Sequence, residues 1–530
     1  MRSPTATGRP QFRRIALATV ALALLVPTRV PTAAAAVSLP TGFVDDTLLT
    51  GLNLPTSMAF LPDGRLLFTE QYTANVRLVV NGHIASTDPI AAVGSVNVGG
   101  YERGLEGITV DPAWPTRPYI YLFYSHASGT LHLDRFTASG DLSDPNGENL
   151  TLGSPLVLIG DILDLTPRHQ AGCLRFAPDG MLMVTVGEDD LGCPAQDSTS
   201  LHGAILRLKV NTLPAGGGGQ VLRSAITPSN NPLSTPDSNA KLVFAYGFRN
   251  PYRMQIDRPT GRVFVADPGQ DTAEELDLVP AGANAGWPYR EGTHVMVPSG
   301  CSEPGGVGAS PYLAPIVNLD RGPVNTVIQV AGMYRAAGGG TANWPAGYFG
   351  DLFYGEYYSG FLKRLRLSAG TWVPGPSAPG QPDASNWATG LASCVDFQLG
   401  PDGSLWWLEQ SPTFTPLNGA LHRIRWTGPS TPPPPASAGL KLTPTPFAVT
   451  TELSFTLATP VPVSLTIHDL AGRTVRRLLW SEIPPLDSSG GAHVMWDGTA
   501  GDGRHLPGGM YFARLEVGGH VETSRLVRIP

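Results

Sequence analysis

Residues 177–180 read Ala-Pro-Asp-Gly, and residues 181–186, which follow directly, read Met-Leu-Met-Val-Thr-Val. This combination of a turn signal and a short apolar run decides the fold. Proline presets φ in such a turn and glycine accepts a positive φ, so the chain can reverse between two strands. Similar turns precede residues 65–70, 119–124, 262–266, 351–355 and 404–409.

Six such units between residues 61 and 409 predict small sheets repeated around a common axis, which is the architecture of a six-bladed β-propeller. The alternative is a large β-sandwich in which the turns recur by coincidence. Few stretches keep an apolar period of 3.6 residues over ten or more positions, so the predicted fold class is all-β.

The composition narrows the class of protein further. Among 530 residues, 62 are glycine and 51 are proline, which is too rich in turn formers for a helical bundle. A hydrophobic fraction of 42% excludes a wholly disordered chain. The net charge of −7 offers no basic field for nucleic acid, so we expect no nucleic-acid partner.

Residues 1–36 are typical of a bacterial-type signal peptide. Three arginines between positions 9 and 14 precede a mostly apolar run at 15–26, and alanines at 34–36 offer a cleavage site. The apolar run is too short for a comfortable membrane span and no second span follows. We expect a secreted protein, periplasmic or extracellular, without a membrane span in the mature chain. An uncleaved anchor is the alternative.

A proline-rich segment marks the clearest domain boundary. Residues 432–435 are four consecutive prolines, which form a stiff spacer. We therefore expect the propeller at 37–427, a linker at 428–437 and a second β-domain at 438–530.

The second domain alternates apolar and polar residues in several short runs, which predicts a β-sandwich. Its stretches 467–473, 496–498 and 507–511 resemble the immunoglobulin-like module at the end of flagellar hook-assembly proteins. We see no catalytic constellation in it. A spacer, sorting or docking role is expected, and a generic accessory domain is the alternative.

Four cysteines allow three disulfide pairings in an exported protein. Cys173 and Cys193 are close in sequence, so we expect them to pair with each other and Cys301 to pair with Cys394. No cysteine and histidine spacing indicates zinc.

A histidine before a predicted strand is the first candidate for chemistry. His169 stands in a loop just ahead of residues 173–176, where an imidazole could act as a general base near neutral pH. Glu188, which follows the next strand, could orient that imidazole. The alternatives are a structural histidine and a solvated acidic loop.

Two further segments carry polar groups at strand ends. Arg249 suits a planar anionic or carbonyl partner because its guanidinium donates two parallel hydrogen bonds, and Asn250 follows it. Residues 267–271 form an oxygen-rich turn that suits Ca²⁺, followed by Glu274 and Glu275. The alternatives are an arginine that pairs between blades and a solvated acidic turn.

Taken together, these segments resemble the exported quinoprotein sugar dehydrogenases, the soluble glucose and aldose dehydrogenase family, whose other branch includes hedgehog-interacting protein. The resemblance covers roughly residues 43–426 in one order. Its landmarks are residues 102–107, the His169 motif, 176–180, 195–197, 203–207, 247–251, 267–277 and 286–288.

The resemblance implies a propeller that holds pyrroloquinoline quinone (PQQ) and Ca²⁺ on its axis and oxidises the C1 hydroxyl of an aldose by hydride transfer to the quinone. His169 would be the general base, with Glu188 and Arg249 beside it, and Ca²⁺ the Lewis acid. The remaining implied roles are quinone contacts from Arg249, Asn250 and Lys363 or Arg364, a substrate contact from Arg103, and Ca²⁺ contacts from Gly269, Gln270, Glu274 and Glu275.

Some positions depart from the family pattern. Glu188 stands where an aspartate is usual, Gln170 and Ala171 replace small and polar residues, and Ala285 replaces an aromatic residue. The leading hypothesis is a PQQ-dependent aldose dehydrogenase with an external electron acceptor, which the sequence does not identify. The alternative is a non-catalytic, Ca²⁺-stabilised propeller that binds a glycan or protein. A Ca²⁺-dependent lactonase would need an axial metal cage that these motifs do not supply.

Overall fold

The computed structural model describes residues 36–529 except 412–413, 429–437, 458–462, 471, 483, 485–490, 502 and 518–519. The predicted signal peptide and linker therefore lie almost wholly outside the described residues. No helix in the described part of the chain is long and apolar enough to cross a membrane.

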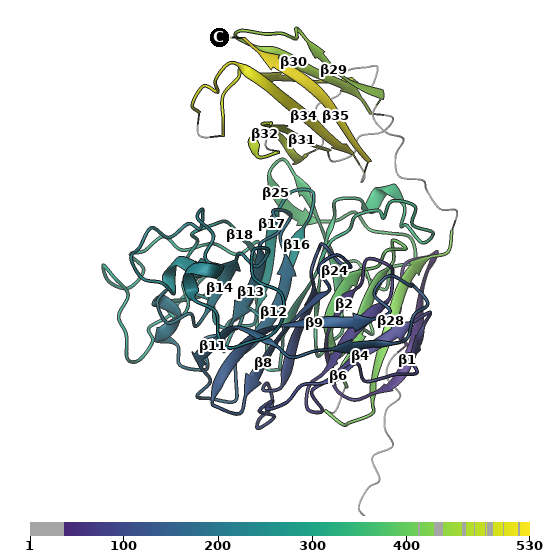
Figure 1. Ribbon diagram of the computed structural model, residues 1–530, viewed down its shortest axis with the longest axis vertical. Helices are drawn as coiled ribbons and strands as arrows, with labels where there is room; N and C mark the ends of the chain where they lie inside the picture. Colours follow the sequence, from purple (N-terminus) through teal and green to yellow (C-terminus); the bar gives the residue numbers. More distant parts are fainter. Residues whose placement is uncertain are drawn as a thin grey trace, which may run out of the picture. The chain divides into compact units, whose positions relative to one another are not determined.

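Six antiparallel sheets make up residues 37–427 (Figure 1). In each sheet the strands are given from the innermost outward. The first sheet contains β2 (Pro55–Phe60), β3 (Leu66–Glu70), β4 (Asn75–Val80), β5 (His83–Ile84) and β6 (Ala91–Ala92), and the second contains β7 (Leu105–Val110), β8 (Tyr119–His126), β9 (Thr130–Gly140), β10 (Leu150–Leu152) and β11 (Leu156–Leu163). The third contains β12 (Ala171–Phe176), β13 (Leu182–Val186), β14 (Ala204–Leu208) and β15 (Val243–Tyr246). The fourth sheet contains β16 (Arg253–Asp257), β17 (Arg262–Asp267), β18 (Ala273–Val279) and β21 (Val317–Asp320), and the fifth contains β22 (Ile328–Met333), β23 (Leu352–Glu356), β24 (Leu362–Ser368) and β25 (Thr371–Pro374). The sixth contains β26 (Cys394–Leu399), β27 (Leu405–Glu409), β28 (Gly419–Trp426) and β1 (Phe43–Leu52).

The innermost strands form a closed ring. β2 contacts β7, β7 contacts β12, β12 contacts β16, β16 contacts β22, β22 contacts β26, and β26 returns to β2. This confirms the predicted six-bladed propeller. The six turn-and-strand units of the sequence fall on β3, β8, β13, β17, β23 and β27, which are the second strands of the six blades. The recurring turn is therefore the one that joins each inner strand to its neighbour.

The last blade is assembled from both ends of the propeller sequence. β1 pairs with β28, and Phe43 lies opposite Trp426 in this ladder. The Phe43 ring forms edge-to-face pairs with the rings of Trp344, Trp387 and Trp426, with ring centroids about 5 Å apart. This aromatic cluster anchors β1 between two blades because edge-to-face pairs add to the burial of apolar area.

A buried guanidinium ties three blades together at the axis. Arg253 is fully buried, and it donates hydrogen bonds to the carbonyl oxygens of Val395 at 2.5 Å, Thr56 at 2.8 Å and Tyr252 at 2.9 Å. Its charge is thus satisfied by backbone dipoles from the first, fourth and sixth blades, as a buried cation requires.

Short elements complete the propeller segment: a hairpin of β19 (Arg290–Glu291) and β20 (His294–Val295), the helix α1 (Arg223–Ile226), and the 3₁₀ helices η1 (Cys193–Gln196), η2 (Ala240–Leu242) and η3 (Ala346–Tyr348).

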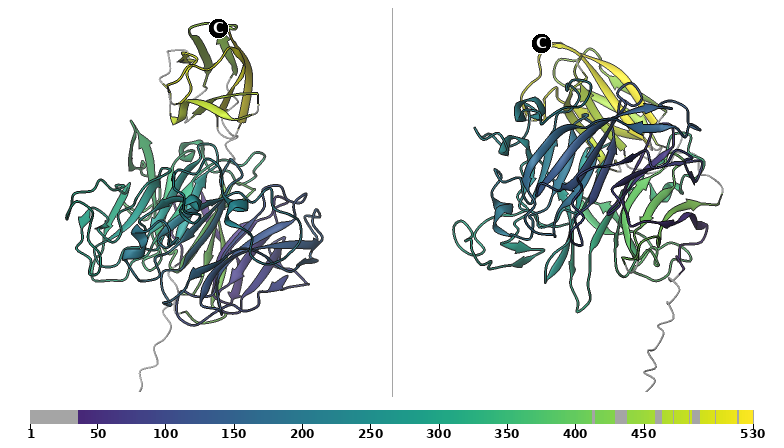
Figure 2. Two further views of the ribbon diagram at one scale, coloured as in Figure 1. Left: turned by 60° about the vertical axis from the view of Figure 1, so that its left-hand side comes forward. Right: turned by 60° about the horizontal axis from the view of Figure 1, so that its bottom comes forward.

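Residues 438–530 form two sheets of their own, drawn in yellow-green to yellow in Figure 2. Their strands, in sheet order, are β29 (Ala438–Thr443), β30 (Thr451–Thr456) and β33 (Gly491–Trp496), then β32 (Thr474–Glu482), β31 (Val463–His468), β34 (Gly509–Val517) and β35 (His520–Arg528). Side chains of both sheets share one apolar core around Trp496. The immunoglobulin-like assignment stays a prediction.

The disulfide pairing differs from the one expected. The bond joins Cys193 to Cys301, whereas Cys173 and Cys394 are buried free thiols. Cys173 points from β12 toward the next blade, where its sulfur accepts a hydrogen bond from the Met254 N–H. Proximity in sequence was a wrong guide because a strand of a blade directs its side chains toward neighbouring blades, not toward the loop that follows.

Candidate functional site

One end of the propeller axis holds a cavity of about 610 Å³, a volume typical of small-molecule sites. Each lining residue stands before or at the start of an inner strand, or after a second strand. Antiparallel pairing of inner and second strands brings these positions to one end, so all six blades contribute. The cavity is lined by Gln71, Tyr101, Glu102, Glu106, Arg168, His169, Ala171, Arg249, Asn250, Tyr252, Pro268, Gly269, Gln270, Arg321, Asn325, Thr326, Val327, Tyr357, Tyr358, Gln410 and Phe414.

The predicted base and its predicted partner form a buried pair at this cavity. The Nδ1 atom of His169 lies 2.6 Å from Oε1 of Glu188, and both side chains are almost fully buried. Asp189, the other acid that could have oriented the imidazole, instead accepts hydrogen bonds from the backbone N–H groups of Leu165 and Thr166. The longer glutamate therefore reaches His169 itself.

Glu188 is held as a carboxylate. Burial raises its pKa, but the hydrogen bond to His169 and the one from the Gly192 N–H outweigh that effect, so its pKa lies below the usual value. A carboxylate only accepts hydrogen bonds, so Nδ1 of His169 is the donor. In the neutral imidazole the lone pair then sits on Nε2.

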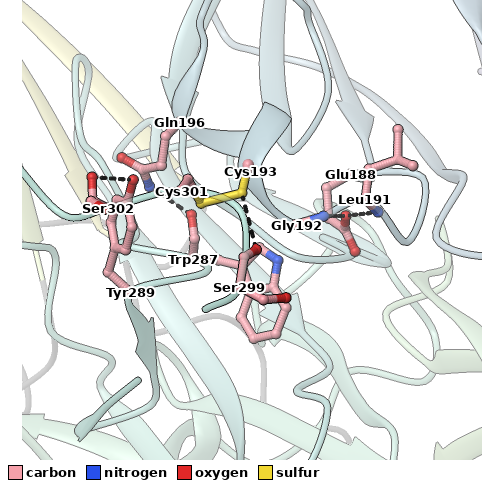
Figure 3. Close-up of a disulfide and its surroundings, with 10 residues drawn as sticks. All are labelled: Glu188, Leu191, Gly192, Cys193, Gln196, Trp287, Tyr289, Ser299, Cys301 and Ser302. Carbon is pink, nitrogen blue, oxygen red and sulfur yellow. Dashed lines mark hydrogen bonds between the residues drawn. A yellow bond between two sulfur atoms is a disulfide. The ribbon is translucent and has the colours of Figure 1, made fainter. Parts of the chain in front are cut away.

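The loop under Glu188 is clamped by the disulfide (Figure 3). Oε2 of Glu188 accepts hydrogen bonds from the N–H groups of Leu191 and Gly192, immediately before Cys193. The bond from Cys193 to Cys301 closes a separation of 108 residues and joins this loop to the segment beyond Trp287. The loop that holds Glu188 is thus tied to a second loop by a covalent cross-link.

Backbone strain accompanies the pair. His169 has φ +61° and Ala171 has φ +58°, in the left-handed region that non-glycine residues rarely adopt. Gly187 makes this close approach possible, because a Cβ there would stand 1.9 Å from the His169 carbonyl oxygen. Such strain persists only where the surrounding structure enforces it, and it is typical of functional sites.

Arg249 and Asn250 lie beside this pair, since the Glu188 N–H donates to the Arg249 carbonyl oxygen at 2.9 Å, and they share one anchor. Their backbone N–H groups donate to the two carboxylate oxygens of Asp267 at 2.9 and 2.6 Å. Burial raises the pKa of Asp267 to about 6, although these two hydrogen bonds oppose the rise. The Nε atom of Arg249 and the Oδ1 atom of Asn250 are buried without a hydrogen-bond partner in the described structure. Two polar atoms of residues that line the cavity therefore lack a protein partner in the described structure.

In the loop predicted to hold Ca²⁺, candidate ligand atoms already have protein partners. Nη1 of Arg321 lies 2.8 Å from the Gly269 carbonyl oxygen and also pairs with the carboxylate of Glu274. Burial raises the pKa of Glu274 to about 7, despite hydrogen bonds from the Ile328 N–H and Thr326. The backbone N–H of Gln270 donates to Glu291 at 2.6 Å.

A buried group of acids lies behind that loop. Glu275 accepts a hydrogen bond from the Gly292 N–H, and both oxygens of Asp277 lack a partner in the described structure. Burial and the neighbouring carboxylates, Asp267 among them, raise the pKa of Glu275 and Asp277 well above their usual values. Their ligand atoms do not converge as a metal site requires. Among the described residues, only His169, Glu188 and Asp190 bring three such atoms within 4.8 Å of one another.

Besides Glu188, Glu274 and Glu275, which are described above, three predicted site residues do not line the cavity. The guanidinium of Arg103 pairs with Asp164 at 3.0 Å. Lys363 and Arg364 lie on β24, the third strand of its blade, where the Lys363 ammonium sits over the Phe361 ring and Arg364 pairs with Asp351. Positions on a third strand lie farther from the axis than positions on an inner strand, and this explains why neither cation reaches the cavity.

Sequence reasoning missed much of the lining. Gln71, Glu106, Tyr357 and Gln410 come from four blades, and a chain of hydrogen bonds connects them. The Tyr357 hydroxyl lies 3.2 Å from Oε1 of Gln410, whose Nε2 donates to Gln71 at 2.9 Å, and Nε2 of Gln71 lies 3.4 Å from Glu106. No local motif marks these residues. The signal that could have identified them is the recurrence of a polar residue directly after the second strand of a blade, as in Gln71 and Gln410.

Comparisons with known proteins bear on this site. A profile described as glucose/sorbosone dehydrogenase matches residues 52–412. Quinoprotein glucose dehydrogenase B of Acinetobacter calcoaceticus is 27% identical over 46% of this chain and 51% of its own length. HIPL1 protein of Arabidopsis thaliana is 35% identical over 28% of this chain and 22% of its own length.

A solved structure shares the fold. The PQQ-bound aldose sugar dehydrogenase of Streptomyces coelicolor has a TM-score of 0.52 and 23% identity, covering 73% of this chain and 99% of that one. The sequence matches to curated relatives are shorter, and the chain spans between 22% and 59% of their lengths.

Proposed function

The chain belongs to the glucose/sorbosone dehydrogenase family, and we propose that it is an exported, PQQ-dependent dehydrogenase that oxidises the C1 hydroxyl of an aldose. The observation that carries the proposal is the buried pair of His169 and Glu188 at the wall of a cavity that also presents Arg249. This arrangement unites a general base, its orienting carboxylate and a planar cation, which are the protein groups that removal of a hydroxyl proton and binding of a quinone require.

His169 is the proposed base. Because Nδ1 donates to Glu188, its Nε2 atom is free to take the proton of the sugar hydroxyl. Glu188 then stabilises the imidazolium that forms, since its carboxylate is already in place at 2.6 Å. Besides this proton, the sugar would give up a hydride, which carries the two electrons of the oxidation, and an external acceptor of unassigned identity would reoxidise the site.

The cavity fits a planar, aromatic polycarboxylate such as PQQ. Arg168, Arg249 and Arg321 line it with positive charge, and Tyr252 and Tyr357 are among its aromatic walls. The unpartnered Nε of Arg249 and Oδ1 of Asn250 offer one donor and one acceptor. When bound, the quinone would supply the two-electron redox chemistry, and these residues would hold and orient it.

The implied Ca²⁺ does not fit the ligand set expected for it. The Gly269 carbonyl oxygen already accepts a hydrogen bond from Arg321, and a divalent cation on the same oxygen would face that guanidinium at close range. Glu274 is the ion-pair partner of the same guanidinium. Gly269, Gln270, Glu274 and Glu275 are therefore not used as metal ligands in this proposal.

The test is reconstitution. The purified chain is incubated with PQQ, with and without Ca²⁺, and reduction of an electron-acceptor dye is followed across a panel of aldoses. His169→Ala should lower turnover by about 10²–10⁴-fold while quinone binding survives, because only the proton acceptor is removed. Unchanged turnover in this variant would overturn the role of His169.

A second candidate function is a non-catalytic propeller that binds a glycan or protein. The observation that favours it is the absence of Lys363 and Arg364 from the lining, since the resemblance assigns a quinone contact to one of them. A folded chain that binds no quinone in the reconstitution assay would support this candidate.

A further inference from the structure

A carboxyl group that the proposed chemistry leaves unused lies in the wall of the cavity. Glu106 is the second residue of the inner strand β7, and its side chain is 4% exposed. It lines the cavity together with Glu102, whose Oε2 accepts hydrogen bonds from the His169 N–H at 2.8 Å and from Nδ2 of Asn250 at 3.2 Å. Two carboxyl groups four residues apart thus border one cavity, and only Glu102 is well hydrogen-bonded.

Glu106 lacks the partners that a buried carboxylate needs. Among the described residues its carboxyl group has a single hydrogen bond, from Nε2 of Gln71 to Oε1 at 3.4 Å, and no cation lies within ion-pair distance. Gln71 divides this amide group among three acceptors, including the Tyr101 carbonyl at 2.9 Å. A buried charge without a counter-ion is unfavourable, and a carboxyl group avoids this cost in free energy by keeping its proton.

The charged and titratable groups around Glu106 do not change this conclusion. Arg253 is the one nearby cation that favours ionisation, but its guanidinium is already occupied by carbonyl oxygens of other blades. Glu102 and Asp164 oppose a further negative charge. Together with burial, which is the largest cause, they raise the pKa of Glu106 to about 8. The other groups that face it or share the cavity are Tyr72, Tyr252, Arg168, His169, Arg249 and Arg321.

We propose that Glu106 is an uncharged carboxylic acid at neutral pH, and that its proton governs the binding of anionic ligands in this cavity. With the Gln71 amide on Oε1, the hydrogen atom belongs on Oε2, where it can be donated to a carboxylate or carbonyl oxygen of the ligand. Loss of this proton removes that donor and adds a second negative charge beside Glu102. The inference deepens the proposed function, because PQQ carries three carboxylates.

The direction of the pH dependence follows from linkage. An anionic ligand stabilises protonated Glu106 and raises its pKa further, so affinity is highest below the pKa of the free protein and falls above it. With a free-protein pKa of about 8, the affinity for an anion should drop about ten-fold between pH 7 and pH 9. Glu106→Gln keeps the shape and the donor but cannot ionise, so its affinity should not change over this range.

The experiment measures binding of PQQ to the purified chain by quenching of tryptophan fluorescence from pH 6.5 to 9.5 at constant ionic strength. Wild type and Glu106→Gln are compared with Glu148→Gln, which removes a carboxylate outside the cavity. The affinity of the wild type and of Glu148→Gln for PQQ should fall about ten-fold between pH 7 and pH 9. The affinity of Glu106→Gln should not change with pH. Equal slopes in wild type and Glu106→Gln would overturn the inference.

Two further readouts separate this inference from the proposed function. If no variant binds PQQ, the proposed function fails, and benzene-1,3,5-tricarboxylate then serves as the anionic probe with the same expected slopes. The infrared difference spectrum between wild type and Glu106→Gln, in which the bands of Glu275 and Asp277 cancel, should show a protonated carboxylic acid at pH 7 that disappears above pH 9. Absence of this band from the wild type would refute the inference whatever the ligand result.

Discussion

Replacing Glu188 by glutamine tests how the site controls the tautomer of His169. One oxygen of Glu188 accepts from Nδ1 of His169 at 2.6 Å, and the other accepts from the N–H groups of Leu191 and Gly192. A carboxylate satisfies both sides because it has two acceptor oxygens. A carboxamide has one oxygen and one NH₂ group, so it can satisfy only one side.

The loop decides which way the glutamine turns. Two backbone N–H groups on one side outnumber the single ring N–H on the other, so the amide oxygen should face Leu191 and Gly192. Its NH₂ group then points at Nδ1, which must become an acceptor, and the ring proton moves to Nε2. His169 can no longer accept a proton at Nε2. The same tautomer error in a serine protease lowers kcat about 10⁴-fold, and we expect a loss of this order for Glu188→Gln.

The assay is dye-linked turnover of the PQQ-reconstituted chain, with Glu188→Asp as the matched control. Aspartate keeps two acceptor oxygens but is shorter by one carbon–carbon bond of about 1.5 Å, so we expect a smaller loss and the native tautomer. Nitrogen NMR of the imidazole reports the tautomer without turnover. If Glu188→Gln retains turnover within ten-fold of the wild type, or keeps the proton on Nδ1, the reasoning is wrong.

Stability offers an independent check on the same residue. The pKa of Glu188 is lowered in the folded protein, so the carboxylate stabilises the fold above its unfolded-state pKa. This contribution is lost as the pH falls through the folded-state pKa. The stability advantage of the wild type over Glu188→Gln should therefore shrink toward acidic pH in urea unfolding.

The remaining predictions concern the cross-link and the occupied carbonyl. Cys193→Ser with Cys301→Ser should lower the free energy of unfolding by about 4–5 kcal/mol, because the bond closes a separation of 108 residues. Urea unfolding measures this loss. An unchanged free energy of unfolding would mean that the two loops keep their positions without the disulfide. Arg321→Gln should make PQQ affinity depend on Ca²⁺, because the Gly269 carbonyl oxygen is freed. Titrations with Ca²⁺ or a chelator test this, and a wild type that already depends on Ca²⁺ would contradict it.

The sequence predicts local features of this protein well. The turns before the second strands are local features, since proline and glycine fix the backbone conformation of the turn itself. These turns predict the number of blades and that each blade is a β-sheet. The pair of His169 and Glu188 was predictable for a similar reason. Each stands beside a strand of the same blade, β12 or β13, and antiparallel pairing of these two strands brings them together.

Features that depend on distant blades escaped prediction. Cys193 meets Cys301 through loops of two blades, and no spacing rule connects them. Gln71, Glu106 and Gln410 converge only because the ring is closed, and each is unremarkable in its own segment. The family resemblance assigns a quinone contact to Lys363 or Arg364, but both lie on the third strand of their blade. Which strand of the blade carried them, and thus their distance from the axis, was not visible in the residues themselves.

The pairing of β1 with β28 has a consequence for the order in which the protein can mature. Residues 43–52 leave the ribosome long before residues 419–426 exist, so the first strand must wait for almost the whole propeller before it finds its partner. Contacts of such sequence separation form slowly, and until then the edge of the last sheet stays open to pairing with other chains. The ladder between these strands is thus the non-covalent seam that closes the ring of blades, and it can form only after the last blade has been synthesised.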